Sequence, residues 1–316
     1  MRKRFLPGLL LGLVLLGGMS AQAAEVTPEL PVRRRQKQGF HLKIPDTTGP
    51  IVTDSALPQA LGTASLEVNT FLAFTGGNFS RGWRRVSAGG EFISLSMPVE
   101  FYYGLAPRTE IQITIPYLQK WASQVGPTNR AAQFGGIGDT CVEFKYLLVK
   151  EGPRVPAVAG IFAVGFPTGH HRNLGARFLG IDQLGQGAYS FTLGFDLFKY
   201  VKPVLLYGDI WYTAFTNGKV NGQKTFCPDQ VTLNLAVELP LSKKWVLLGE
   251  MVSTWDVGRL IGPTPNQPST AIVSVLPAIE FLPTNWVNIA AGIKIDLIGK
   301  NTAFTYTPVV ALFLYY

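Results

Sequence analysis

The strongest constraint on the fold is a period-two alternation of apolar and polar residues that recurs from about residue 63 to the end of the chain. In residues 110–117, for example, isoleucine at every second position alternates with Glu110, Gln112 and Thr114. Successive side chains of a β-strand point to opposite faces, so this pattern is typical of strands whose two faces meet different surroundings. We predict twelve strands, at about 63–74, 92–103, 110–117, 139–148, 158–166, 189–197, 203–215, 231–239, 244–255, 270–282, 287–297 and 304–316.

The number, length and spacing of these strands favour a membrane barrel. Their number is even, and strands of this length cross a bilayer when tilted. Short turns alternate with longer loops rich in Gly, Pro and Asn. We therefore predict an all-β protein, a transmembrane antiparallel up-and-down β-barrel of about 12 strands with short periplasmic turns and longer extracellular loops. A soluble β-sandwich also alternates, but the apolar faces here exceed what one sandwich core needs.

Composition excludes two other classes of protein. The chain is 47% hydrophobic and 12% aromatic, with 15% charged residues, whereas disordered chains are rich in charge and poor in aromatics. After the N-terminus, no apolar run reaches the roughly 18 residues of a membrane-spanning helix.

Five prolines within or beside the predicted strands (Pro98, Pro116, Pro156, Pro277 and Pro308) are expected at bulges or strand ends.

The N-terminus has the features of a secretory signal peptide, residues 1–23. Three basic residues precede the apolar stretch Phe5–Leu16 and the small-residue cleavage site Ala21–Ala23. The apolar stretch is too short for a membrane anchor and no stop-transfer pattern follows it. Removing the signal lowers the net charge by three from +8. We expect the mature protein in the outer membrane of a Gram-negative-type bacterium.

The inner face of the predicted barrel is acidic. Two basic residues share it with eleven acids, and the predicted lumen-lining set also contains four aromatic residues. The full set is Glu67, Glu100, Glu110, Asp139, Glu143, Lys145, Asp196, Asp209, Glu238, Glu250, Glu280, Lys294, Asp296, Phe92, Tyr102, Tyr207 and Trp211. Such a lumen either favours cations or is filled, with its carboxylates bonded to hydroxyl groups and the two lysines.

Residues 24–60 lack periodicity and form a basic, proline-containing periplasmic tail ahead of the barrel, residues 61–316. Arg33, Arg34, Arg35 and Lys37 would start beside the mouth of the acidic lumen. They either dock there as a partial plug or belong to a disordered tail. If they form a plug, deleting residues 24–60 raises the conductance.

Sites for catalysis and metals are not indicated by the sequence. Of the three histidines, His41 lies in the tail and the pair His170 and His171 in a loop, away from strand-borne partners. Cysteines or histidines with metal-ligand spacing are absent, so we expect no metal, no cofactor and no enzymatic activity. Export permits a disulfide between Cys141 and Cys227, but a single pair does not require one.

Basic residues of the predicted outer loops indicate a phosphorylated lipid as partner. They are Arg81, Arg84, Arg85, Lys120, Arg130, Arg172, Arg177, Lys219, Lys224, Arg259 and Lys300. Membrane lipid and lipopolysaccharide suit this distribution, whereas nucleic acid does not suit an exported barrel.

Several segments in a shared order resemble the outer-membrane family named for the MetA pathway of phenol degradation. They are Gly49–Asp54 leading to Gly62, Tyr103–Glu110 running to Pro116 and Tyr117, Gly136–Asp139 before Phe144–Tyr146, and Phe166–Gly169. The resemblance spans most of residues 49–316 and implies an outer-membrane barrel that passes hydrophobic or aromatic compounds toward a catabolic pathway. Tyr316 resembles the terminal aromatic residue by which the barrel-assembly machinery recognises its substrates.

Together these features predict a monomeric, porin-like barrel that allows passive passage of small compounds, aromatic and hydrophobic ones among them. A sealed structural or lipid-contacting barrel without transport is the alternative. A lipid-modifying barrel enzyme is a third possibility.

Overall fold

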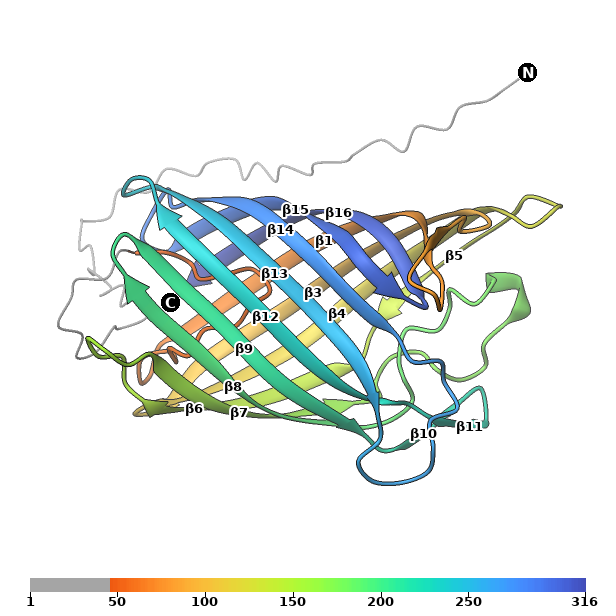
Figure 1. Cartoon of the computed structure of the whole chain (residues 1–316), viewed down its shortest axis with the longest axis horizontal. Coiled ribbons are helices and arrows are strands. Elements are labelled where there is room, and N and C mark those ends of the chain that lie inside the picture. Colours follow the sequence, from red (N-terminus) through yellow and green to blue (C-terminus); the bar gives the residue numbers. More distant parts are fainter. Residues whose placement is uncertain (1–45) are drawn as a thin grey trace, which may run out of the picture. The chain divides into compact units, whose positions relative to one another are not determined.

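The computed structural model describes residues 46–316, and these form a closed antiparallel barrel of twelve long strands (Figure 1). Its wall consists of β1 (Ala64–Phe79), β3 (Glu91–Ala106), β4 (Thr109–Val125), β6 (Thr140–Val149), β7 (Ala157–Phe166), β8 (Ser190–Val201), β9 (Val204–Phe215), β12 (Asp229–Pro240), β13 (Trp245–Gly258), β14 (Ala271–Phe281), β15 (Val287–Lys300) and β16 (Thr302–Tyr315). Each strand pairs with its neighbour in sequence, and β16 pairs with β1 to close the wall. The predicted fold class is confirmed.

Short and long connections alternate around the wall as far as β15, as predicted, whereas β15 and β16 are joined by Asn301 alone. We call the end with the long connections the loop end and the other the turn end. Smaller elements lie at the loop end: β2 (Arg85–Val86), β5 (Arg130–Ile137), the hairpin of β10 (Asn217–Val220) and β11 (Gln223–Phe226), and the 3-10 turn η1 (Ala176–Phe178). Figure 1 labels β5, β10 and β11 there. No helix in the described part of the chain is long and apolar enough to cross a membrane.

The third predicted strand is longer in the structure than its pattern indicated. It was expected to end at Tyr117, but β4 continues to Val125 and pairs there with β5. The first half of β4 pairs with β6 instead, so β5 and β6 together occupy one position in the wall. Residues beyond Tyr117 mix polar and aromatic side chains without strict alternation, which is why periodicity did not extend the strand.

The two faces of the wall differ as a membrane barrel requires. Leu193 and Phe195 on β8 point outward and are 63% and 52% exposed. Asp196, the residue after Phe195, points inward and is fully buried. Leu235 on β12 is likewise 50% exposed. A broad apolar outer face is stable in hydrocarbon and would be unfavourable in water, so this face contacts lipid.

Four prolines lie inside strands without costing ladder hydrogen bonds. Pro98 and Pro116 face each other across β3 and β4, while Pro277 and Pro308 lie in β14 and β16. Toward its second neighbouring strand, each proline lies where the pairing is interrupted. The gap beside Pro98 is between β3 and β1, and the gap beside Pro116 is where β4 changes partner from β6 to β5. Pro277 lies at a gap between β14 and β15, and Pro308 at a gap between β16 and β1. The missing proline N–H therefore leaves no inter-strand bond unmade. Pro156 directly precedes β7.

The core lies inside the barrel and is completed by residues 46–62, which we call the inserted segment (orange in Figure 1). This segment contains no helix or strand. Its Ile51 and Ala56 pack against apolar side chains of the inner wall, including Leu205, Leu248 and Leu276. Burying this apolar surface stabilises the segment within the turn-end half of the lumen.

The inserted segment joins the wall through a tight turn at Gly62, whose φ of +76° favours glycine. The Gly62 N–H donates to the Gly104 carbonyl at 2.8 Å, and the Gly104 N–H donates to the Thr63 carbonyl at 3.0 Å. A Cβ on Gly104 would lie 1.9 Å from the Ala60 carbonyl oxygen. Glycine at position 104 thus allows the segment to turn back into the lumen beside β3.

Candidate functional site

One wall carboxylate, Glu250 on β13, holds the middle of the inserted segment. Three successive backbone N–H groups, of Ile51, Val52 and Thr53, donate to its two oxygens at 2.7, 3.1 and 2.7 Å. The Thr53 hydroxyl donates a fourth bond at 2.8 Å. Consecutive backbone N–H groups that point the same way form an anion-binding site. Here the N–H groups of the inserted segment form that site, and the bound anion is the Glu250 carboxylate of the wall.

Three further carboxylates hold other parts of the segment in the same manner. The Thr48 N–H donates to Glu280 at 3.2 Å, and the Asp54 N–H donates to Asp209 at 3.0 Å. Nearer β1, the backbone N–H of Gln59 donates to Glu110 at 2.6 Å. These acceptors come from β14, β9 and β4, so the segment is fixed from several sides of the lumen.

Lys145 on β6 supplies a positive charge between the wall and the segment. Its side chain is 2% exposed, and Nζ lies 2.6 Å from Asp54 Oδ2 and 3.4 Å from Asp196 Oδ2. Glu110 and Glu143 lie 3.6 and 4.0 Å from the same nitrogen. Because a buried charge is tolerated only when paired, this lysine and the segment's Asp54 depend on each other.

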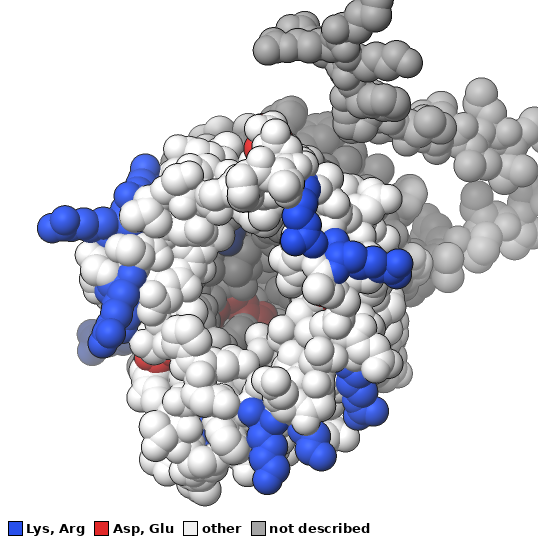
Figure 2. Space-filling view, turned by 90° about the vertical axis from the view of Figure 1, so that its right-hand side faces the viewer, with Lys and Arg blue, Asp and Glu red and all other residues white. Residues whose placement is uncertain are grey.

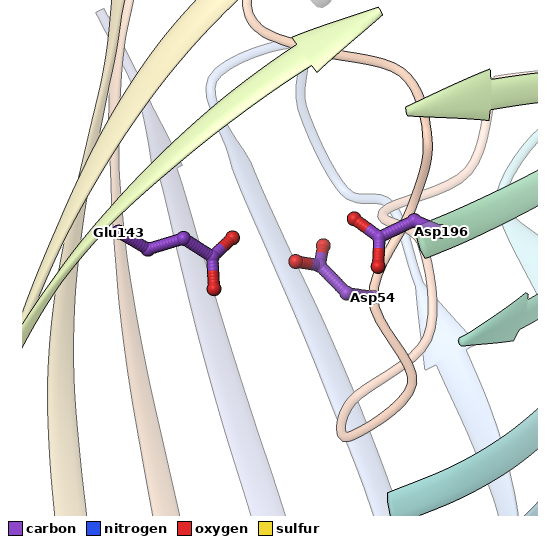
Figure 3. Close-up of side chains that lie close together, drawn as sticks. All are labelled: Asp54, Glu143 and Asp196. Carbon is purple, nitrogen blue, oxygen red and sulfur yellow. The ribbon is translucent and has the colours of Figure 1, made fainter. Parts of the chain in front are cut away.

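Figure 3 shows that Asp54, Glu143 and Asp196 point toward one another. One oxygen from each lies within 4.8 Å of the others, a spacing that could hold a metal ion. The ammonium group of Lys145 already lies against these oxygens, however, and provides the counter-charge. We therefore interpret the cluster as an ion-pair centre that fixes the inserted segment.

Most of the other predicted lumen residues are bonded to neighbours on the inner face. Tyr102 donates to Glu67 and Glu100, Tyr207 donates to Glu238, and Trp211 donates to Asp196 through Nε1. Asp296 accepts bonds from Ser274 and Thr305 and lies 3.9 Å from Lys294. Many of the inner carboxylates are thus satisfied by hydroxyl, indole or backbone donors.

Two residues of the predicted set lie away from this cluster. Asp139 falls between β5 and β6 and accepts bonds from the backbone N–H groups of Gly169 and Gln186, so it positions the long loop at 167–189. Phe92 is half-buried near the loop end of β3. Arg33, Arg34, Arg35 and Lys37, predicted to form a plug, lie outside the described residues.

Sequence reasoning missed the inserted segment's own contribution. Asp54 and the backbone donors at 48–59 have no periodicity that marks them as lumen residues. The excess of acids over bases on the inner face did indicate that further donors were needed, because buried carboxylates require hydrogen-bond donors. The segment supplies many of them.

A cavity of about 320 Å³ lies on the loop-end side of the inserted segment. Its wall residues come from the middle of the strands, and a second, smaller cavity of about 40 Å³ lies toward the turn end. Figure 2, a view onto the loop end, shows a hollow with acidic atoms at its floor and Lys and Arg side chains around its rim. The barrel is thus hollow on the loop side and filled on the turn side.

His170 and His171, the histidines of the described residues, bond to the backbone of their own loop. His170 Nδ1 lies 2.8 Å from the Asp182 carbonyl, and His171 Nδ1 lies 2.7 Å from the Gly169 carbonyl, so both order the loop that contains them. Cys141 and Cys227 are both free thiols. Burial raises the pKa of the Cys227 thiol, which lies in the connection before β12.

Comparison with known proteins places the fold among outer-membrane barrels. No family model and no curated protein sequence matches the chain. Among solved structures, the chain is similar to the COG4313 outer membrane channel from Pseudomonas putida F1, with a TM-score of 0.68 and 14% identity, covering 85% of this chain and 100% of that one. At this identity the likeness establishes the fold and not the activity.

Lower similarity is found to other barrels. The translocator domain of autotransporter NalP from Neisseria meningitidis has a TM-score of 0.46 and 12% identity, covering 81% of this chain and 89% of that one. The CymD monoaromatic hydrocarbon channel has a TM-score of 0.42 and 8% identity, covering 82% and 90%. The chain has the closed barrel and apolar outer face of a Gram-negative outer-membrane protein, which confirms the predicted location.

Proposed function

We propose that the protein is a passive outer-membrane channel for small compounds, aromatic and hydrophobic ones among them, and that the inserted segment restricts passage. The observation that carries this proposal is the cavity of about 320 Å³, which lies inside a closed barrel and directly against residues 48–55. Pockets of roughly 300–1,000 Å³ suit small-molecule ligands. A solute that enters from the loop end therefore meets a space of its own size and then the segment.

Aromatic substrates are supported by the sequence resemblance to the MetA pathway family and by the fold. One structure similar to this chain is that of an outer membrane channel. Within the cavity, Phe71, Tyr102 and Trp211 offer ring surfaces. We propose membership in that family and a channel rather than an enzyme. Among the described residues, His170 and His171 bond to loop carbonyls.

The decisive experiment is conductance of the refolded mature protein in planar bilayers, together with swelling of proteoliposomes in small neutral sugars. A channel gives discrete conductance steps and measurable swelling. The inner carboxylates predict that the steps are cation-selective, because acidic lumens favour cations. Bilayers that stay silent at every voltage and salt concentration would refute the proposal.

A second candidate is a sealed barrel without transport, favoured by the four wall carboxylates that anchor the inserted segment. If the segment never leaves, the turn-end half of the lumen stays filled. The complete mature chain separates the two candidates, because it conducts only if the protein is a channel. A variant that lacks residues 24–60 conducts in both cases and is the positive control.

The partners we propose follow from the two ends and the outer face of the barrel. The apolar band contacts membrane lipid, and exposed loop residues such as Arg84, Arg85, Arg172 and Lys224 suit the phosphates of lipopolysaccharide. The C-terminal Tyr316 supports assembly by the barrel-assembly machinery, and the closed wall is compatible with a monomer.

A further inference from the structure

We propose that the outer face of the barrel carries a binding site for a phosphorylated lipid of the outer leaflet, at the loop end of β8, β9 and β12. This inference rests on the lipid partner proposed above and gives that partner a defined site. It holds whether or not the protein conducts. Three neighbouring features support it: an apolar groove in the wall, an exposed apolar tip, and two lysines that face each other.

The groove lies on the outer face of the wall and has a volume of about 570 Å³. Gly160 contributes no side chain to its lining, which leaves the groove open there. The apolar side chains of the lining come from three neighbouring strands and include Leu193, Phe195, Ile210, Tyr212 and Val231. An empty apolar groove loses dispersion contacts, so in a bilayer hydrocarbon fills it. An acyl chain suits this groove.

The apolar tip consists of Leu260 and Ile261, in the connection between β13 and β14. Their side chains are 77% and 81% exposed, the highest values for large apolar side chains among residues 46–316. An exposed apolar pair of this kind is unfavourable in water and indicates contact with another apolar surface. For an outer-membrane barrel, the hydrocarbon of the outer leaflet is such a surface.

Hydrogen bonds hold the apolar tip against the loop end of the groove. The Leu260 N–H donates to Asp229 Oδ2 at 2.8 Å, and the Tyr212 hydroxyl donates to the same oxygen at 2.7 Å. Tyr212 is the Cα partner of the outward-pointing Leu193, and both line the groove. The other Asp229 oxygen accepts the Phe215 N–H at 3.2 Å, so this carboxylate is satisfied. The tip and the groove are therefore adjacent.

The two lysines lie opposite each other in the hairpin of β10 and β11. Lys219 and Lys224 are Cα partners beside the tight turn at Asn221 and Gly222, whose φ values of +49° and +81° are typical of a two-residue hairpin. Both lysines are exposed, and neither side chain has an ion pair or hydrogen bond with another residue of 46–316. Like charges at such opposed positions are destabilising. A phosphate group between the two ammonium groups would remove this repulsion.

The hairpin is fixed to the loop that carries the apolar tip. The Phe226 N–H donates to Asn266 Oδ1 at 2.8 Å, and Asn266 Nδ2 donates to the Lys224 carbonyl at 3.2 Å. Beside the tip, Arg259 donates to Asn217 Oδ1 at 3.0 Å. Figure 1 shows this loop beside β10 and β11. The positive charges and the apolar surface are thus held together, as a lipid with a phosphate headgroup requires.

Calorimetric titration of the complete mature protein in detergent micelles tests the site with three probes. Phosphatidic acid carries a phosphate and acyl chains, diacylglycerol with the same chains lacks the phosphate, and inorganic phosphate lacks the chains. We expect phosphatidic acid to bind about tenfold more tightly than either, since charge-assisted hydrogen bonds add to apolar burial. Equal affinity for phosphatidic acid and diacylglycerol would overturn the inference, and so would equal affinity for phosphatidic acid and inorganic phosphate.

Charge variants test the lysine pair. Replacing both lysines, Lys219→Gln with Lys224→Gln, should weaken phosphatidic acid binding about tenfold and leave diacylglycerol binding unchanged. The matched control is Lys243→Gln with Lys244→Gln, which removes two exposed lysines from the connection between β12 and β13 at the turn end. An equal loss in both double variants would show that net charge, and not this site, attracts the lipid.

A groove-filling variant tests the acyl chain. A Cβ on Gly160 would have its nearest contact at 3.4 Å, so Gly160→Leu is accommodated and occupies the groove. It should weaken binding of phosphatidic acid and diacylglycerol alike, about tenfold. Gly249→Leu is the control, because its Cβ has its nearest contact at 3.8 Å and Gly249 does not line the groove. Resistance of each barrel to unfolding in detergent on gels checks folding, and a folded Gly160→Leu barrel with unchanged binding would refute the groove.

One competing occupant of the apolar tip is a second copy of the chain. A lipid-free dimer in micelles that Leu260→Ser and Ile261→Ser abolish would assign the tip to that copy and overturn the inference. The titration measures lipid binding and not passage. Lipid binding by a protein that stays silent in bilayers would therefore refute the channel and support the site, and conductance without lipid binding would do the reverse.

Discussion

Lys145 and Asp54 form an ion pair of 2.6 Å inside the barrel, and this pair connects strand β6 to the inserted segment. The lysine side chain is 2% exposed and lies within 4.0 Å of carboxylates from β4, β6 and β8 as well. A single ammonium group thus organises the negative charge of the wall and the position of the segment.

Replacing Lys145 by Met should strongly destabilise the barrel, because several buried carboxylates would lose their shared counter-charge. Breaking a buried ion pair by removing one partner costs about 3–5 kcal/mol. The midpoint of thermal unfolding, followed by gel mobility, should fall clearly. Lys294→Met is the control, since the Lys294 side chain is 27% exposed and pairs only at 3.9 Å. Equal shifts for the two variants would contradict the central role of Lys145.

Replacing Glu250 by Gln should loosen the inserted segment while preserving side-chain volume. The amide group turns an N–H₂ toward backbone donors that now bond to the carboxylate at 2.7–3.1 Å. A hydrogen bond to a charged group contributes about 1.5–3 kcal/mol. We expect larger conductance steps and proteolytic cleavage within residues 46–62, detected by mass spectrometry. Asp296→Asn should show neither effect, and an uncleaved, unchanged Glu250→Gln variant would refute this anchoring role.

Replacing Gly104 by Ala should displace the start of the inserted segment. The added Cβ would lie 1.9 Å from the Ala60 carbonyl oxygen, which belongs to the backbone and cannot rotate away. Overpacking of this kind costs about 1–3 kcal/mol. Gly249→Ala is a strand control whose Cβ has its nearest contact at 3.8 Å. The yield of heat-resistant barrel measures the effect, and equal yields would argue against close packing at Gly104.

The Cys227 thiol should react slowly in the folded protein. Burial raises its pKa, so at pH 7.5 less of it is thiolate than in the unfolded chain, and the reaction should accelerate as the pH rises toward that pKa. Maleimide labelling of a Cys141→Ser variant, folded and unfolded, measures the difference. Equal rates in the two states would show that the thiol is accessible.

Strand positions could be predicted from the sequence because each face of the wall meets one environment along its whole length. The run Ile111, Ile113 and Ile115 meets lipid, and its polar neighbours meet the lumen. Alternation also placed Glu110, Lys145 and Asp196 on the same inner face, where the structure brings them together. It failed at residues 118–125, which extend β4 without a regular alternation.

The inserted segment could not be predicted by the same reasoning. Its contacts with Glu250 and Glu280 are made by backbone N–H groups, which every residue except proline possesses, so no side-chain pattern marks them. Asp54 was visible in the sequence only as part of the Gly49–Asp54 motif. Its partner Lys145 lies 91 residues away in the chain, and pairing at that distance depends on the closed barrel.

The anchors of the inserted segment also impose an order on assembly. Its four carboxylate partners lie on β4, β9, β13 and β14, and they surround the segment only once β16 has paired with β1. Forming contacts of such high sequence separation costs loop-closure entropy before they stabilise the fold. We therefore expect the inserted segment to dock only after the wall has closed.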